Sequence, residues 1–159
     1  MIIDKEGLDS LIPHKGKMLL LSGVREYNLE ERSLCAEYNI TEDCLFFDPA
    51  TGAVPAWAGF EFMAQAISLL SGIRGRIMGV EPRIGFIMSV SSMQIAVPSF
   101  KTGSIVEVKV KEKNSLDLVY NFTGEIFLEG RKVMEGNLTV MDASDEQIEI
   151  IKKENIQIE

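Results

Sequence analysis

The sequence is poor in the residues that build metal centres and disulfide frameworks. Its 159 residues include one histidine, His14, and two cysteines, Cys35 and Cys44. One histidine cannot form a histidine-rich metal site, and no ligand-spaced cluster of carboxylates supports a mixed one. Two cysteines this close together are too few for a disulfide framework and are expected to be reduced thiols. We therefore expect a cytoplasmic protein without a metal ion.

Long apolar runs and an excess of basic residues are also absent. No apolar stretch of about 18 residues is free of charge, which argues against a membrane span. Acidic residues at Asp4, Glu6 and Asp9 interrupt the N-terminal segment, so it does not read as a signal peptide. The 16 basic residues are outnumbered by 24 acidic ones, giving a formal net charge of −8. A nucleic-acid-binding protein needs a basic surface, so we expect neither a nucleic-acid nor a membrane partner.

What is present is the composition of a soluble globular domain. Hydrophobic residues make up 46% and charged residues 25%, and the chain is long enough to bury a sizeable core. We expect one domain over residues 1–159. The charged tail, residues 143–159, is helix-prone and is expected to pack loosely.

The order of the predicted elements indicates an α+β fold. A short helix is expected over residues 4–12. The predicted strands cover residues 18–27, 32–40, 84–97, 105–113, 116–129 and 132–141. After Pro55, apolar residues recur at spacings of three and four, typical of a helix of about five turns. It is apolar almost all round, hence buried, and Gly72, Gly75 and Gly79 are expected to unwind it. Without strand–helix–strand alternation, we expect an antiparallel sheet wrapped around this helix, with its edges covered in a homodimer.

Glu61 is the most informative residue, because it places a carboxylate in an otherwise apolar helix. Gln65 and Ser68 follow four and seven residues later, so the three side chains form one narrow polar stripe. Burial raises a carboxyl pKa, while the positive end of the helix dipole opposes that rise. Perturbed carboxylates cluster at functional sites. Two interpretations stay open: Glu61 braces a neighbouring loop, or it acts as an acid, base or orienting group in a cleft.

His14 lies between Pro13 and Lys15 in a short loop. Its imidazole is the only side chain here whose unperturbed pKa lies near neutrality, which makes it the natural general base or acid. The alternative is a loop histidine that is exposed or locally bonded.

Candidate binding groups flank both ends of the long helix. At its start they are Pro55, Ala56, Trp57, Ala58 and Gly59. Unpaired backbone N–H groups at a helix start can hold a carbonyl oxygen or an oxyanion. Beyond its end they are Arg74, Arg76 and Arg83. An arginine cluster in an acidic protein can hold a phosphate or an acidic partner. The open alternatives are a plain helix start and a set of solvated loop charges.

Three segments resemble the 3-hydroxyacyl-acyl-carrier-protein dehydratases, in order and at matching spacing. LIPHKGKMLLLSGV resembles their Leu-Pro-His start, and GAVPAWAGFEFMAQAISLLSG resembles their central-helix segment. RIGFIMSVSSMQIAVPSFKTGSIVEVKV resembles the strand pair that follows. The PAWAGFEFMAQA form is most similar to the dehydratase-like branch associated with aryl polyene synthesis. The resemblance covers residues 8–141.

The resemblance implies a hotdog fold, a curved antiparallel sheet wrapped around one long central helix, paired into a dimer. It also implies thioester substrates on phosphopantetheine and no metal or organic cofactor. In the family, a histidine of one chain and the helix glutamate of the other remove water at the dimer interface. Glu61 matches that glutamate, whereas the position of the family histidine falls at Phe47. A histidine-based mechanism in this chain must therefore use His14.

The main hypothesis is dehydration of 3-hydroxyacyl thioesters to trans-2-enoyl thioesters in fatty acid or polyene-type lipid biosynthesis. The substrate is carried on acyl carrier protein or coenzyme A. His14 would abstract the C2 proton, and a backbone N–H between Trp57 and Gly59 would polarise the thioester carbonyl. Glu61, oriented by Gln65, would protonate the leaving 3-hydroxyl group. The three arginines would contact the phosphopantetheine phosphate or the acidic carrier.

Two other outcomes stay open. In one, Glu61 works with a water molecule as in hotdog acyl thioesterases. In the other, the chain is a non-catalytic acyl-binding or accessory subunit. The dimer in either case could pair further or with a different subunit.

Overall fold

A six-stranded sheet, a two-stranded sheet and one long helix form the body of the molecule. The computed structural model describes residues 1–12, 14–80 and 85–153. The helices are α1 (Lys5–Leu8), the 3₁₀ turns η1 (Gly16–Met18) and η2 (Ala56–Ala58), α2 (Gly59–Met78) and α3 (Asp145–Lys153). The strands are β1 (Gly23–Asn28), β2 (Ser33–Asn39), β3 (Ala53–Pro55), β4 (Gly85–Ile95), β5 (Ser99–Lys101), β6 (Ile105–Leu116), β7 (Val119–Leu128) and β8 (Arg131–Asp142).

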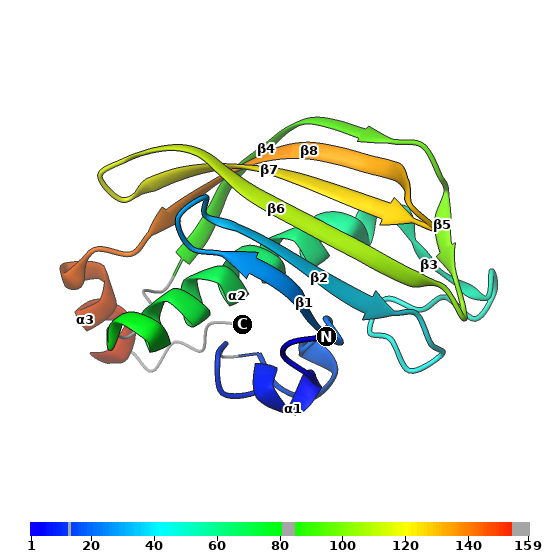
Figure 1. Ribbon diagram of the computed structural model, residues 1–159, viewed down its shortest axis with the longest axis horizontal. Coiled ribbons are helices and arrows are strands. Elements are labelled where there is room, and N and C mark those ends of the chain that lie inside the picture. Colours follow the sequence, from blue (N-terminus) through cyan, green and yellow to red (C-terminus); the bar gives the residue numbers. More distant parts are fainter. Residues whose placement is uncertain (13, 81–84, 154–159) are drawn as a thin grey trace.

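The larger sheet curves around α2, as Figure 1 shows. Its strand order is β1-β2-β6-β7-β8-β4, and every neighbouring pair is antiparallel. β3 and β5 pair separately where the chain enters α2. This is the hotdog arrangement, so the predicted α+β class and the sheet wrapped around one helix are confirmed. The dimer stays a prediction.

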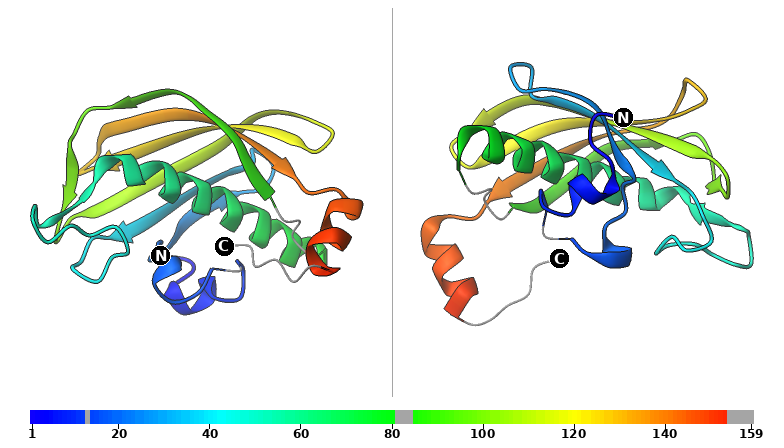
Figure 2. Two further views of the ribbon diagram at one scale, coloured as in Figure 1. Left: turned by 180° about the vertical axis from the view of Figure 1, so that it is seen from behind. Right: turned by 60° about the horizontal axis from the view of Figure 1, so that its bottom comes forward.

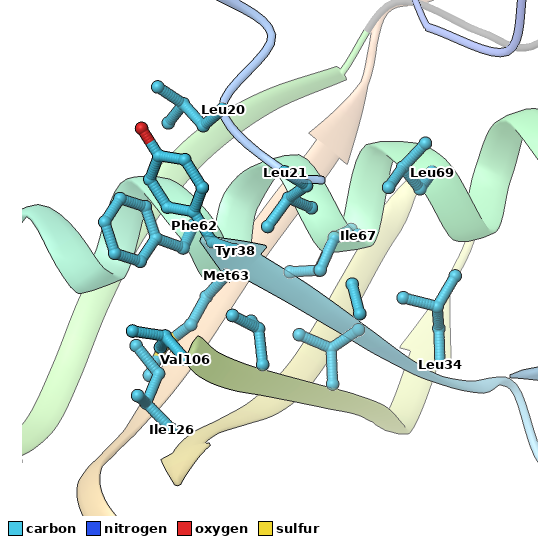
Figure 3. Packing of buried hydrophobic residues seen from close by; sticks show 14 of the residues in the cluster. Leu20, Leu21, Leu34, Tyr38, Phe62, Met63, Ile67, Leu69, Val106 and Ile126 are labelled. Carbon is cyan, nitrogen blue, oxygen red and sulfur yellow. The ribbon is translucent and has the colours of Figure 1, made fainter. Parts of the chain in front are cut away.

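The core lies between α2 and the concave face of the sheet. Val106, Val108 and Val110 of β6 are fully or almost fully buried, as strict alternation along the strand predicted. Met63 and Ile67 of α2 are buried with them. Figure 3 shows these helix side chains directed toward the strands. Burial of this one face fixes how α2 is rotated about its axis, and therefore which of its residues point away from the sheet.

The predicted end of the long helix is wrong, because α2 continues through two of the three glycines expected to unwind it. Only Gly79 has a left-handed backbone, with φ of 69°, and it forms the C-cap. Gly72 stays helical and is a point of close approach. A Cβ built there would lie 2.2 Å from the carbonyl oxygen of Leu11. The glycine therefore serves a packing contact instead of a helix end.

The predicted strand over residues 18–27 is too long, because β1 begins at Gly23. The backbone groups of Met18, Leu20 and Leu21 bond to the side chain of Gln65, so a helix residue takes the place of a neighbouring strand. The N-terminal helix is also shorter than predicted. After Leu8 the chain turns, and the N–H of Leu11 bonds to its carbonyl at 3.0 Å.

Two further boundaries differ from the prediction, and two short strands were missed. β6 runs to Leu116, and the turn at Asp117, with φ of 53°, delays the start of β7 to Val119. β3 and β5 were not predicted, because three-residue strands are too short for an alternation pattern. The helix-prone tail forms α3, whereas residues 154–159, Pro13 and Ile84 lie outside the described residues.

Candidate functional site

Glu61 lies in the first turn of α2, on the side of the helix turned away from the sheet. Burial of its half-buried carboxyl group raises its pKa above the usual value of 4.5. Burial is the cause of this shift. The position close to the N-terminus of α2 favours the ionised form and therefore opposes the shift. A carboxyl group whose pKa is raised in this way keeps its proton to a higher pH than an exposed one, which is the property a general acid needs.

The residues that lead into α2 have separate roles in the fold. Pro55 pairs with Ser99 in the small sheet, and the N–H of Ala56 bonds to the carbonyl of Pro98 at 3.1 Å. The N–H of Gly59 bonds to the carbonyls of Ala56 and Trp57. Of the backbone donors between Trp57 and Gly59 that were predicted to polarise a thioester carbonyl, that of Gly59 is thus engaged within the chain, as is the N–H of the preceding Ala56.

Trp57 is the exposed member of this segment, while Ala56, Ala58 and Gly59 are buried. Its indole ring is 52% exposed and meets the ring of Phe46 edge to face, with centroids 5.4 Å apart. Phe46 was not singled out in the sequence, because nothing in a one-dimensional pattern places the loop over residues 41–52 beside the helix start. The half-exposed Trp57 and the partly buried Phe46 therefore form an apolar surface at the start of the helix that carries Glu61.

Gln65 has different partners from the one predicted. Its Oε1 accepts hydrogen bonds from the N–H groups of Leu20 and Leu21, at 2.8 and 3.0 Å. Its Nε2 donates to the carbonyl of Met18 at 2.8 Å. The side chain is 4% exposed and is directed to the backbone of residues 18–21. Gln65 and Glu61 lie on the same stripe of the helix, and we predicted that the Gln65 amide would orient the Glu61 carboxylate. The amide instead binds the backbone of residues 18–21.

His14 lies between α1 and η1, in a segment that runs along α2. Its Nδ1 atom is shielded from solvent, and the residue as a whole is half-buried. Two contacts bracket it: Leu11 approaches Gly72, and Met18 bonds to Gln65. The segment that carries His14 is therefore attached to the stretch of α2 that begins one turn beyond Glu61.

The predicted arginine cluster is divided between two sides of the molecule. Arg74 lines a pocket of about 80 Å³ between α2 and the sheet, together with Arg32, Tyr120 and Asp142. Arg76, two residues later, donates from Nη2 to the carbonyl of Ser10 at 3.2 Å. Residues two apart on a helix point in nearly opposite directions. The described residues thus do not form one arginine patch, and Arg83 lies outside them.

The pocket at Arg74 holds charged groups that the sequence did not indicate. Arg32 and Glu112 form an ion pair in which Nη1 of Arg32 donates to both carboxylate oxygens of Glu112, at 2.9 and 2.8 Å. Burial, with a smaller contribution from the Asp142 carboxylate, raises the pKa of the nearby Tyr120 hydroxyl. These residues are far apart in the sequence, so only the sheet register brings them together.

Metal binding and membrane insertion can also be checked for the residues that the structure describes. No group of three or more histidine, cysteine, aspartate or glutamate side chains among them is placed to hold a metal ion. None of the helices that they form combines the length and the apolar character required to cross a membrane.

Comparisons with known proteins agree on one kind of relative. A family model described as ApeP dehydratase matches residues 7–152. A curated 3-hydroxyacyl-[acyl-carrier-protein] dehydratase FabZ from Anaeromyxobacter dehalogenans (strain 2CP-C) is 28% identical over 149 residues, covering 92% of this chain and 94% of its own. A FabZ dehydratase from Chlamydia caviae is 36% identical over 75 residues, covering 45% of this chain and 49% of its own.

Solved structures share the fold at lower identity. The dehydratase heterocomplex ApeI:P from Xenorhabdus doucetiae contains a chain with a TM-score of 0.81 and 22% identity, covering 91% of this chain and 96% of that chain. A thioesterase-like phenylacetic acid degradation-related protein from Ralstonia eutropha gives a TM-score of 0.56 at 19% identity, covering 74% and 82%. At these identities the similarity establishes the hotdog fold alone.

Proposed function

The chain belongs to the ApeP-like dehydratase family, and from this premise we propose that it removes water from 3-hydroxyacyl thioesters to give trans-2-enoyl thioesters. The curated relatives act on substrates carried by acyl carrier protein, which supports the same carrier here. The observation that carries the proposal is Glu61, a half-buried carboxyl group with a raised pKa in the first turn of the central helix.

The proposed reaction consists of two proton transfers and needs no metal or organic cofactor. His14 takes the C2 proton, whose acidity comes from the thioester carbonyl. The electron pair left on C2 forms the C2–C3 double bond, and the C3–O bond breaks. Protonated Glu61 gives its proton to the departing hydroxyl group, which leaves as water. Because backbone donors of Ala56 and Gly59 are engaged, we assign the carbonyl contact to the N–H groups of Trp57 and Ala58.

We further propose that His14 works with Glu61 of a second copy. Within one chain, the segment that carries His14 contacts α2 at Gln65 and Gly72, which lie one turn and about three turns from Glu61. A pair of groups acting on adjacent substrate carbons must lie closer together than most of this range. A dimer that brings two copies of α2 together can supply the missing proximity.

The surface of β4 supports a homodimer. Among the described strands β4 pairs with β8 alone and forms an edge of the sheet, yet it carries exposed apolar side chains. Phe86, Ile87, Met88 and Val90 are 38 to 56% exposed. An apolar edge strand invites pairing with another chain and is usually covered. We propose that β4 of a second copy covers it and that the chain acts as one domain in the cytoplasm.

For carrier recognition we propose Arg76, because its bond to Ser10 places it beside the segment that holds His14. Arg74 and Arg83 complete the proposed set. Arg74, however, faces the pocket under the sheet and would have to turn outward to meet a phosphate. Replacing acyl carrier protein by coenzyme A in the assay below decides which carrier these arginines serve.

A second function, as an accessory subunit, is favoured by one observation. The position of the family histidine is occupied by Phe47, a partly buried side chain packed against the core. A phenyl ring has no basic nitrogen and cannot act as a general base. In this reading the chain would lend Glu61 to a mixed dimer, in which a different hotdog subunit contributes the histidine.

The test is to incubate the protein with a 3-hydroxyacyl thioester of acyl carrier protein and follow the loss of one water by mass spectrometry. We expect dehydration by the wild type, and loss of it in Glu61→Gln and His14→Ala. Glu42→Gln, which alters an exposed glutamate, is the matched control and should stay active. Release of free acid would indicate a thioesterase. Activity only with a second subunit would indicate the accessory role, and activity that survives both site variants would refute the residue assignments.

A further inference from the structure

One stripe of α2 holds the N-terminal segment, defined here as residues 8–21. Arg76 bonds to the carbonyl of Ser10, Gly72 lies under the carbonyl of Leu11, and Gln65 bonds to Met18, Leu20 and Leu21. The helix positions 65, 72 and 76 are seven and four residues apart, so they lie on one face. Figure 2 shows this part of the chain on the side of α2 away from the sheet. The N-terminal segment therefore runs antiparallel to α2 and toward Glu61.

Gln65 makes the strongest of these attachments. It satisfies two backbone N–H groups and one carbonyl, all at 2.8 to 3.0 Å. Leu20 and Leu21 are almost fully buried, and Figure 3 shows Leu21 against α2. Buried backbone groups need a partner, and no strand pairs with residues 19–21 among the described elements. The side chain of Gln65 therefore serves this stretch as a neighbouring strand would.

A short hydrogen-bonded turn, η1, connects the residues bound by Gln65 to His14. The N–H of Met18 bonds to the carbonyl of Lys15 at 3.1 Å, and that of Leu19 bonds to Gly16 at 3.1 Å. These bonds close η1 immediately after His14. On the other side, the buried Leu11 is fixed by its contact with Gly72. The backbone of His14 thus lies between two anchored points.

We infer that Gln65 is a positioning residue, whose three backbone hydrogen bonds fix the N-terminal segment and thereby aim the His14 imidazole at the substrate carbon. The inference rests on the proposed function in one respect, namely that His14 is the base. Gln65 touches neither substrate nor reacting atoms in this account. Its effect on the reaction passes through the placement of His14.

The kinetic test compares Gln65→Leu, which removes all three bonds, with Gln65→Glu, which keeps the two accepted from Leu20 and Leu21. The matched control is Gln147→Glu, at an exposed position of α3, which keeps an oxygen to accept the hydrogen bond from the N–H of Ser144. A misplacement of about 1 Å can cost roughly 100-fold in rate, so we expect kcat of Gln65→Leu to fall by at least about tenfold. KM should change less, Gln65→Glu should lie between Gln65→Leu and the wild type, and the control should match the wild type.

A second readout does not depend on activity. Because His14 is the only histidine, the two carbon-bound protons of its ring give the only histidine ring signals in the NMR spectrum. We expect Gln65→Leu to shift the His14 resonances and titration midpoint, and to speed amide exchange at Leu20 and Leu21. In the wild type these two amides should exchange as slowly as the buried part of α2.

The two readouts separate this inference from the proposed function. A folded Gln65→Leu variant with wild-type kcat and an unchanged His14 signal would overturn the inference. If that variant does not fold, rapid exchange of Leu20 and Leu21 in the wild type would overturn it instead. A wild type that never dehydrates substrate, yet shows the protected amides and the Gln65-dependent His14 signal, would refute the proposed base while leaving the positioning of the imidazole intact.

Discussion

Substitution of Gly72 by alanine tests how closely the N-terminal segment is packed against α2. The new Cβ would lie 2.2 Å from the carbonyl oxygen of Leu11, and 3.1 Å from its carbonyl carbon. Both atoms are backbone, so the conflict cannot be relieved by a side-chain rotation. Overpacking of this kind costs about 1–3 kcal/mol, whereas alanine is the better helix former by about 1 kcal/mol. Because backbone must move, we expect a net loss of about 1–2 kcal/mol of unfolding free energy.

The assay is thermal unfolding followed by circular dichroism. For a chain of this length, about 1 kcal/mol corresponds to about 2–4 °C, so Tm should fall by about 2–8 °C. Dehydratase activity should fall as well, since the displaced residues lie next to His14. The control is Ser71→Ala, at the exposed neighbouring position, where better helix propensity should leave Tm unchanged or slightly higher. If Gly72→Ala raises Tm as the control does, the close approach of Leu11 is not present in solution and the reasoning is refuted.

Three other predictions follow from ionisable groups. Burial raises the pKa of the Glu61 carboxyl, so its contribution to stability is present below about pH 4.5 and is lost as the pH rises through the folded-state pKa. The Tm of Glu61→Gln minus that of the wild type should therefore increase as the pH is raised from about 4 to about 7. A Tm difference that does not change with pH would contradict this. Arg32→Met leaves the Glu112 carboxylate, 10% exposed, without its two-fold partner and should cost about 1–3 kcal/mol in urea unfolding; an unchanged midpoint would refute the contribution of that pair. Burial also raises the pKa of the Cys35 thiol, so iodoacetamide should label it more slowly than Cys44 in the native protein, as peptide mass mapping can measure. Equal rates would show that Cys35 is accessible.

Much of the architecture could be predicted because it depends on local periodicity. The alternation of Val106, Val108 and Val110 predicted a strand with one buried face, and the structure confirms it. The recurrence of apolar residues after Pro55 predicted the long helix, and α2 occupies that stretch. The predicted C-terminal end of this helix was wrong because a glycine can either end a helix or allow close packing within it. Gly79 provides a left-handed cap, whereas Gly72 provides room for another backbone, and a sequence does not distinguish them.

The candidate site was predictable as a set of residue types but not as a set of contacts. The carboxylate of Glu61 in an apolar helix was evident from the sequence, and burial does raise its pKa. Gln65 was expected to serve Glu61 because the two are four residues apart, yet its hydrogen bonds go to Leu20 and Leu21. Helical spacing shows which residues share a face, but not which distant segment covers that face.

The sequence by itself determined the fold class, the identity of the central helix and the candidate acid, because each depends on side-chain chemistry repeated at short range. Only the tertiary structure decided that Gln65 anchors the N-terminal segment, that Arg74 and Arg76 serve opposite sides of α2, and that His14 is held along the helix. These are contacts between residues distant in the chain. Their geometry follows from the rotation of α2 against the sheet, which is set by burial of the whole core and not by any one motif.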